Sequence, residues 1–235
     1  MRRRPAIKLF LSLLCLLAAG AASAQGAPAD LPLVEVQAPR PGGDTLAVFY
    51  SGDGGWARLD RGVSRALAAH GTPTVGVDSR RYFWTPRDPD GSARDLTRIL
   101  HHYLPAWKRE KILLIGYSFG ADVLPFLANR LPPDLLARVE LIGLIGASHM
   151  ATFEFHLTDW LVGGRNERPV LPEVRKLAGR RLLCIYGRKE DDTLCPNLGQ
   201  DLGKTAPLPG GHHFGGAYET IAALLLREVD LGGGQ

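Results

Sequence analysis

A serine between two glycines is the first group in this chain whose type and spacing could do chemistry. Gly116, Ser118 and Gly120 form the pattern G-x-S-x-G, directly after the apolar run 112–115 and before an apolar segment of helical character. In a sharp strand-to-helix turn this pattern strains the serine backbone, and side chains in place of the glycines would collide where strand and helix approach. The strain aims the hydroxyl out of the sheet, so Ser118 is predicted to be a nucleophile.

Backbone amides near that serine could stabilise a developing oxyanion. The start of the following helix supplies N–H groups and a positive dipole end, with the N–H of Phe119 as the first donor. The glycine-rich loop 51–55 after an earlier strand should supply the second donor, and Asp53 is the preferred residue there. Two alternatives stay open: 51–55 could be a tight connecting turn, and Ser118 could lie in an ordinary strand-to-helix turn.

A serine hydroxyl needs a general base, and the base needs a carboxylate to orient it. In chains with this turn the expected order is serine, then acid, then histidine. The acidic loop 187–196 follows the late strand 181–186, at the sheet edge where such sites form. Asp192 is the preferred acid because it stands shortly before a proline, and Asp191 is the alternative. Either aspartate could instead be a solvated acid in a turn.

The histidine is expected in the loop 208–216 before the final helix, where glycines surround His212 and His213. His213 is the preferred base and His212 is the alternative; the other histidine would lie at the mouth of the site. Five further histidines precede the acidic loop and do not fit the order: His70, His101, His102, His149 and His156. No cluster has the spacing of metal ligands, so neither a metal nor another cofactor is predicted.

The first 24 residues have the three parts of a secretory signal peptide. A basic start is followed by the apolar run 9–17 and by the small residues Ala22, Ser23 and Ala24. Cleavage is expected after Ala24. The apolar run is short for a membrane span, although an uncleaved anchor is the alternative.

Charge and cysteine content are interpreted on the mature chain. The signal peptide holds four basic residues and no acid, so the net charge of +4 becomes zero, with 24 basic and 24 acidic residues. With no basic stripe among aromatic residues, no nucleic-acid binding is predicted. Cys184 and Cys195 remain, and an even pair in an exported chain favours a disulfide over two reduced thiols. Its short loop would brace the acidic turn.

Strands and helices are expected to alternate along the rest of the chain. The expected strands, the first of them at an edge, are 33–37, 45–50, 73–77, 112–115, 139–145, 181–186 and 205–208. The expected helices are 59–70, 92–107 with Ser92 as its cap, the segment after Ser118, a short one near Asn197, and 218–229. Residues 78–90 are expected to be irregular. The alternation predicts an α/β fold, with a mostly parallel central sheet and helices on both faces.

One domain accounts for the mature chain. Residues 25–32 are expected to form a flexible leader, and 33–231 to form a single domain of the α/β class. No insertion is long enough for a large lid, although 149–172 could form a small cap.

Four blocks of sequence are specific in combination. They are SGDGGW at 51–56, DSRRYFW at 78–84, GYSFGADVLP at 116–125 and PGGHHF at 209–214. Together they resemble the VirJ and AcvB family of bacterial virulence proteins, over nearly all of the mature chain. The chain is similar to the short VirJ type, because the additional N-terminal domain of AcvB is not found in it.

The resemblance implies a periplasmic protein with an α/β-hydrolase-like fold and a link to type IV secretion and DNA transfer to plant cells. AcvB-like members are linked to hydrolysis of lysyl-phosphatidylglycerol, which releases lysine from the lipid headgroup. That reaction suits Ser118, which would form a lysyl ester that water then cleaves. A cationic substrate would need nearby acids, and Asp122 and Asp53 are the candidates. Weaker candidates are Glu154 and Asp159, and further substrate contacts are expected from Gly52 and Tyr117.

Asp122 has a second interpretation, in which it packs against the glycine-rich loop and only stabilises it. The leading functional hypothesis is a periplasmic serine hydrolase that cleaves an ester, with an aminoacylated phospholipid at the membrane surface as its substrate. A general carboxylesterase for small or acyl esters is the second hypothesis. A non-catalytic periplasmic adaptor that contacts type IV secretion proteins is the third.

Overall fold

The computed structural model describes residues 28–40, 42–155 and 167–232. The predicted signal peptide, residues 1–24, and the candidate Asp159 lie outside these residues. Seven strands of the described chain form one sheet in the order β1-β3-β2-β4-β5-β8-β9. They are β1 (Leu33–Val36), β2 (Thr45–Tyr50), β3 (Thr74–Val77), β4 (Lys111–Tyr117), β5 (Val139–Ile145), β8 (Leu182–Gly187) and β9 (Lys204–Leu208). Neighbouring strands run parallel except at the edge, where β1 is antiparallel to β3.

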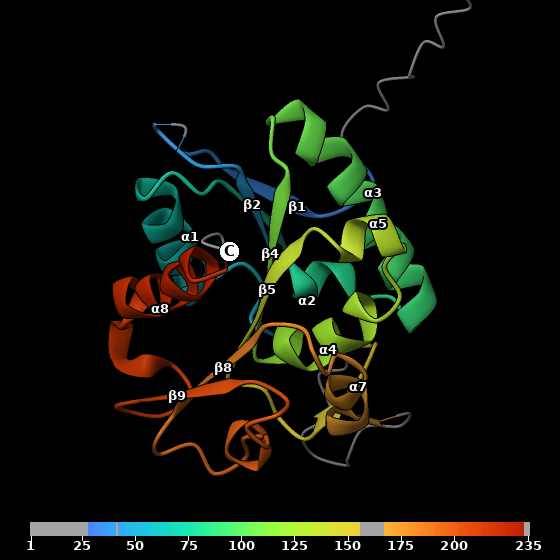
Figure 1. Ribbon diagram of the computed structural model, residues 1–235. Helices are drawn as coiled ribbons and strands as arrows, with labels where there is room; N and C mark the ends of the chain where they lie inside the picture. Colours follow the sequence, from blue (N-terminus) through green and yellow to red (C-terminus); the bar gives the residue numbers. More distant parts are fainter. Residues whose placement is uncertain (1–27, 41, 156–166, 233–235) are drawn as a thin grey trace, which may run out of the picture.

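Helices cover both faces of this sheet (Figure 1). On one face lie α1 (Arg58–Ala69) and α8 (Tyr218–Asp230), and on the other lie α3 (Pro89–Ala106), α4 (Phe119–Ala128) and α7 (Val170–Lys176). The predicted fold class, an α/β-hydrolase fold with a mostly parallel sheet, is confirmed.

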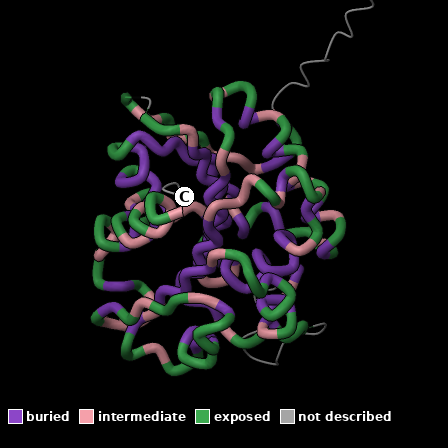
Figure 2. Tube along the Cα trace, in the orientation of Figure 1, coloured by how far each residue is buried: buried purple, intermediate pink, exposed green. Residues whose placement is uncertain are grey.

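The central strands have apolar side chains on both faces, as a sheet covered by helices requires. Every residue of β2 is buried, and its side chains alternate between two cores. Leu46, Val48 and Tyr50 face the core under α3 and α4, whereas Ala47 and Phe49 face the core under α1 and α8. Figure 2 shows the buried residues concentrated along these strands. The sheet is therefore a rigid platform for the loops at its edges.

Short elements complete the chain. They are α2 (Ser79–Tyr82), α5 (Pro133–Leu136), β6 (Met150–Ala151), β7 (Arg168–Pro169) and the 3₁₀ turns η1 (Cys195–Asn197) and η2 (Phe214–Gly216). The strands β6 and β7 pair with each other inside the segment 149–172, where a small cap was expected. Residues 156–166 between them are outside the described part of the chain.

Three details differ from the sequence-based expectations. The helix α3 begins at Pro89 because Asp88 caps it, accepting the N–H of Gly91 at 2.8 Å, while Ser92 is buried inside the helix. Residues 78–90 are not wholly irregular, since they include α2. The leader predicted over 25–32 is not flexible at 28–32, where Leu31 is buried in the core and Asp30 pairs with Arg98 at 2.6 Å.

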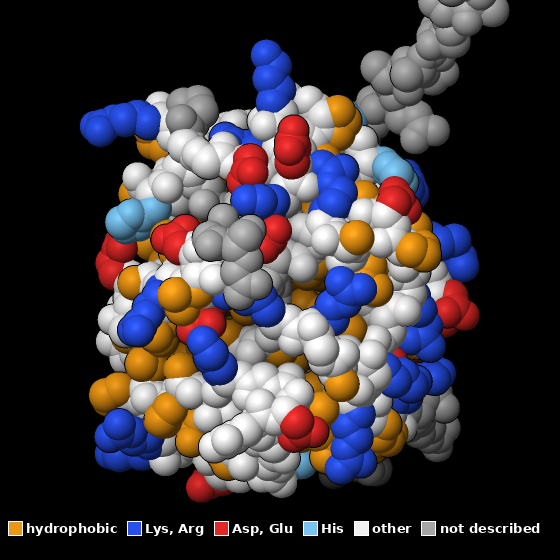
Figure 3. All heavy atoms as spheres, viewed as in Figure 1, with side chains coloured by type: hydrophobic (Ala, Val, Ile, Leu, Met, Phe, Trp, Pro, Cys, Tyr) orange, Lys and Arg blue, Asp and Glu red, His pale blue; other side chains and the backbone are white. Residues whose placement is uncertain are grey.

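The surface of the described chain is mixed in character. Lys and Arg side chains lie among acidic and apolar ones across the face shown in Figure 3. Among the described helices, none combines the length and the apolar composition needed to cross a bilayer.

Candidate active site

Ser118 lies in a strained turn between the end of β4 and the start of α4. Its backbone has φ 52° and ψ −122°, a combination that side chains rarely allow. A Cβ atom on Gly116 would lie 2.4 Å from the carbonyl oxygen of Gly120, and one on Gly120 would lie 2.1 Å from that of Tyr50. Neither position can hold a side chain. The turn thus has the geometry that the G-x-S-x-G pattern predicts.

His212 is the histidine that meets this serine. Its Nε2 atom lies 2.8 Å from Oγ of Ser118, and its ring stacks on Tyr117 with centroids 5.3 Å apart. His213 instead places Nδ1 2.9 Å from the Tyr117 hydroxyl. The geometry contradicts the preference for His213, because the alternative, His212, is the histidine that contacts Ser118. Two features direct His212 toward the serine. Its ring stacks on Tyr117, and the buried Phe214 side chain fixes the course of the histidine loop.

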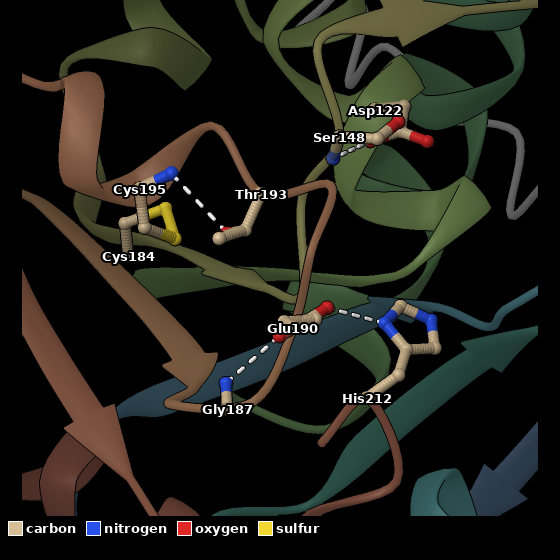
Figure 4. The surroundings of a disulfide bond; sticks show 8 residues. All are labelled: Asp122, Ser148, Cys184, Gly187, Glu190, Thr193, Cys195 and His212. Carbon is tan, nitrogen blue, oxygen red and sulfur yellow. Dashed lines mark hydrogen bonds and ion pairs between the residues drawn. A yellow bond between two sulfur atoms is a disulfide. The ribbon is translucent and has the colours of Figure 1, made fainter.

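Glu190 is the acid that orients this histidine, as Figure 4 shows. Its Oε1 atom is hydrogen-bonded to Nδ1 of His212, and its Oε2 atom accepts the N–H of Gly187 at 2.8 Å. The Glu190 side chain is only 5% exposed. Neither predicted aspartate takes this position. Asp192 is 72% exposed and contacts Nδ1 of His149 at 2.7 Å, and Asp191 is exposed.

Contacts between the acidic loop and the histidine loop explain why Glu190 is selected. The N–H of Arg188 donates to Leu208 and the N–H of Lys189 donates to Gly210, both at 2.9 Å. A tight turn follows, in which the N–H of Glu190 donates to Gly187 at 2.9 Å. Glu190, three residues after the end of β8, therefore lies against His212. Asp192, two residues later, contacts His149 instead. The end of β8 at Gly187 was the sequence signal for Glu190, and the proximity of a proline was a poorer guide.

The predicted disulfide is present. Cys184 in β8 and Cys195 at the start of η1 are joined, with their Cα atoms 5.4 Å apart. Both cysteines are fully buried, and the bond closes the loop that carries Glu190 (Figure 4). The cross-link thus fixes both ends of the acidic loop.

The glycine-rich loop lies beside the serine, as an oxyanion site requires. A Cβ atom on Gly52 would lie 3.4 Å from Cβ of Ser118 and 3.2 Å from the Tyr117 ring. Phe119 is the first residue of α4, so its N–H has no acceptor within its own helix. The loop and the helix start thus flank Ser118, and the N–H groups of Phe119 and Asp53 remain the proposed oxyanion donors.

Asp122 supports a loop and does not face an open site. It is buried, and its Oδ1 atom accepts the N–H of Ser148 at 2.7 Å. Burial raises the pKa of Asp122 well above its usual value, against the effect of the hydrogen bonds from Ser148. A Cβ atom on Gly146, in the same loop, would lie 3.0 Å from the His212 ring. Asp122 therefore positions a loop beside the histidine, which fits neither a cation contact nor packing on residues 51–55.

A cavity of about 460 Å³ is lined by His212 and by Tyr117, the residue before Ser118. Its walls come from the glycine-rich loop, the start of α1 and the histidine loop, including Gly52, Tyr117 and His212. The volume is sufficient for a small ligand or for one part of a larger one. Within 28–40, 42–155 and 167–232, no group of three or more His, Cys, Asp or Glu side chains is arranged to hold a metal ion.

The family model described as bacterial virulence protein (VirJ) matches residues 44–231. The chain belongs to this family. Among curated proteins none matches the chain. Family membership and a disulfide, which is typical of proteins outside the reducing cytosol, together indicate an exported protein.

Solved structures with low sequence identity share the fold. Est1E from Butyrivibrio proteoclasticus with bound ferulic acid is 11% identical, with 85% of this chain and 96% of that chain covered and a TM-score of 0.61. MenH from S. aureus is 13% identical, with 84% and 98% covered and a TM-score of 0.58. An α/β serine hydrolase without a lid from Xanthomonas campestris is 14% identical, with 85% and 88% covered and a TM-score of 0.53.

Proposed function

We propose that this VirJ-family protein is an ester hydrolase that uses Ser118 as nucleophile, His212 as general base and Glu190 as the acid that orients the histidine. The observation that carries this proposal is the continuous chain of hydrogen bonds from Ser118 through His212 to Glu190, on a strained strand-to-helix turn. The esterases and hydrolases that share the fold support it by analogy.

In the first half of the reaction, Oγ of Ser118 attacks the ester carbonyl carbon while Nε2 of His212 takes the hydroxyl proton. Glu190 stabilises the resulting imidazolium through its contact with Nδ1. Because the Glu190 side chain is almost completely buried, solvent screens the attraction between the two charges only weakly. The oxyanion would accept hydrogen bonds from the backbone N–H groups of Phe119 and Asp53. The tetrahedral intermediate then collapses, and His212 returns the proton to the departing alcohol.

In the second half, a water molecule attacks the acyl-serine ester. His212 accepts a proton from that water, and a second tetrahedral intermediate forms in the same oxyanion site. Its collapse breaks the acyl bond to Ser118, which regains its proton from His212, and the carboxylic acid leaves. No cofactor is needed for either half.

We also propose a periplasmic location and the aminoacyl ester of lysyl-phosphatidylglycerol as the substrate. Both rest on the family resemblance, and a periplasmic location agrees with an exported, disulfide-bonded chain. An aminoacyl ester is an activated acyl group, which suits a serine nucleophile. Contact with type IV secretion proteins would be a further role of the same protein.

Labelling with a serine-reactive fluorophosphonate probe tests the proposal. The wild-type protein should be labelled at neutral pH, and the Ser118→Ala and His212→Ala variants should not. Labelling that persists in Ser118→Ala would disprove the assigned nucleophile. Turnover of lysyl-phosphatidylglycerol, compared with short nitrophenyl esters, then separates the lipid substrate from general esterase activity. A Ser118→Ala protein that fully restored secretion in a deletion strain would favour the adaptor role.

A further inference from the structure

Ser51 is the residue at which β2 ends and the glycine-rich loop begins. It is 0% exposed, and its backbone N–H donates to the carbonyl of Val77, at the end of β3, at 3.1 Å. Its own carbonyl lies against α4, since a Cβ atom on Gly120 would lie 2.7 Å from that oxygen. The backbone of Ser51 is therefore fixed between the sheet and the helix that follows Ser118.

The hydroxyl of Ser51 both accepts and donates a hydrogen bond. Its Oγ atom accepts the N–H of Ser79, the first residue of α2, at 2.9 Å. The same Oγ atom lies 3.3 Å from the carbonyl oxygen of Gly52, to which it donates. A serine hydroxyl has one proton, and the N–H of Ser79 leaves that proton free for Gly52. The hydroxyl thus links α2 to the carbonyl of Gly52.

Two donors hold the carbonyl of Gly52. Besides the Ser51 hydroxyl, the N–H of Gly55 donates to it at 3.0 Å. The peptide bond between Gly52 and Asp53 is trans, so the carbonyl of Gly52 and the N–H of Asp53 point in opposite directions. Fixing the direction of this carbonyl therefore fixes the direction of the Asp53 N–H, which is the second proposed oxyanion donor.

The rest of the glycine-rich loop places few restraints on this peptide. Residues 52, 54 and 55 are glycines, whose backbone rotates at low steric cost. A Cβ atom on Gly54 would have no atom of the described chain within 4 Å, so side-chain packing does not fix the loop there. A rotated peptide would turn the carbonyl of Gly52 toward the oxyanion, and two partial negative charges would then repel. The hydrogen bond from Ser51 opposes this rotation.

We propose that Ser51 is a positioning residue for the oxyanion site, whose hydroxyl directs the N–H of Asp53 toward the oxyanion by holding the carbonyl of Gly52. The donated hydrogen bond also polarises the peptide, which makes its N–H a stronger donor. The inference rests on the proposed ester hydrolysis at Ser118. Ser51 itself does not touch the substrate and acts only through the loop.

The variant Ser51→Ala removes the hydroxyl and keeps the backbone. Ser64→Ala is the matched control, because Ser64 in α1 is also 0% exposed, its hydroxyl has no partner in the described chain, and it is not part of the cavity lining. Ser51→Cys is the second variant, in which a thiol fills the position but donates only weakly. Melting curves show which of these variants fold.

The first measurement is steady-state hydrolysis of a nitrophenyl ester across a range of pH. Ser51→Ala should lower kcat about 10- to 100-fold and leave KM unchanged, because an oxyanion interaction forms only in the transition state. Ser51→Cys should give an intermediate kcat, and Ser64→Ala should match the wild type. The pH dependence of kcat should stay the same in all of them, since His212 and Glu190 are untouched.

Two kinetic outcomes would overturn the proposal. A wild-type kcat in Ser51→Ala, or in Ser51→Cys if the alanine variant does not fold, would leave the hydroxyl a purely structural role. A loss of kcat together with a displaced pH profile would place the effect at His212 and not at the oxyanion site.

Nuclear magnetic resonance separates this proposal from the proposed reaction. In Ser51→Ala the ¹³C shift of the Gly52 carbonyl and the ¹⁵N shift of Asp53 should both move, and in Ser64→Ala both should stay. If the wild-type protein cleaves no ester but these shifts move, the hydrolase proposal fails and the hold of Ser51 on this peptide stands. Unchanged shifts in Ser51→Ala would refute the positioning role, whether or not the protein is a hydrolase.

Discussion

Two of the histidine–carboxylate pairs in the described chain lie near the carboxyl edge of the sheet, and they differ in their further partners and in burial. In both, Nδ1 of the histidine meets a carboxylate: His212 meets Glu190, and His149 meets Asp192. Beyond the first ring lies Oγ of Ser118 at 2.8 Å, whereas beyond the second lies Nδ2 of Asn197 at 3.3 Å. Only the first pair therefore has a nucleophile to activate.

Burial is the second difference. The Glu190 side chain is 5% exposed and its second oxygen is held by Gly187, whereas Asp192 is 72% exposed. Solvent screens an exposed pair, so the His149–Asp192 contact contributes little beyond local order. A histidine–acid contact can therefore serve catalysis only when the acid is held rigidly and buried and when a strained serine contacts the other nitrogen of the histidine ring.

Replacing each of these two histidines by alanine in turn should give the largest contrast in kcat. His212→Ala removes the general base, so kcat for ester hydrolysis should fall roughly 10⁴- to 10⁶-fold. His149→Ala, the matched control on the exposed pair, should leave kcat unchanged. Steady-state kinetics on a nitrophenyl ester measures both, and a comparable loss in His149→Ala would remove the distinction between the pairs.

The two acids should differ in the same direction by a smaller amount. Glu190→Gln keeps the shape of the side chain but loses the charge that stabilises the imidazolium, so kcat should fall roughly 10²- to 10⁴-fold. Asp192→Asn should have no effect on kcat, because its charge lies in solvent. A large loss with Asp192→Asn and none with Glu190→Gln would restore the sequence-based choice of Asp192.

The disulfide should matter for stability more than for chemistry. It closes a loop with a sequence separation of 11, so replacing Cys184 and Cys195 by alanine should lower the free energy of unfolding by about 3 kcal/mol. Urea unfolding measures the loss. Reductant should destabilise the wild-type protein to the same extent and leave the double variant unaffected; a double variant as stable as the wild type would contradict the bracing role.

The pH dependence of stability should reveal the buried carboxyl of Asp60. Its pKa is raised from 3.8 to about 6 on folding, so the folded protein binds more protons than the unfolded chain between these values. The free energy of unfolding should therefore fall as the pH rises through this window, by at most about 1 kcal/mol per pH unit from this group. Asp60→Asn should make the slope shallower in urea unfolding from pH 4 to 6.5, and an identical slope would contradict the shift.

The sequence by itself determined the elements and the serine. Apolar runs identified β2, β4 and β5, because strands covered on both faces need apolar residues on both faces. The G-x-S-x-G pattern placed Ser118 in a strained turn, because only glycine fits where Gly116 and Gly120 meet the neighbouring backbone. The pair Cys184 and Cys195 followed from cysteine count and expected compartment.

Only the tertiary structure decided which acid and which histidine meet the serine. Three acids in one loop and two histidines in another were all compatible with the chain order, since order constrains topology but not side-chain direction. The choice of His212 depends on stacking against Tyr117, and the choice of Glu190 depends on how its loop hydrogen-bonds to the histidine loop. The burial of the Asp60 carboxyl was beyond the reach of sequence, because it arises only once α1 packs beside the glycine-rich loop.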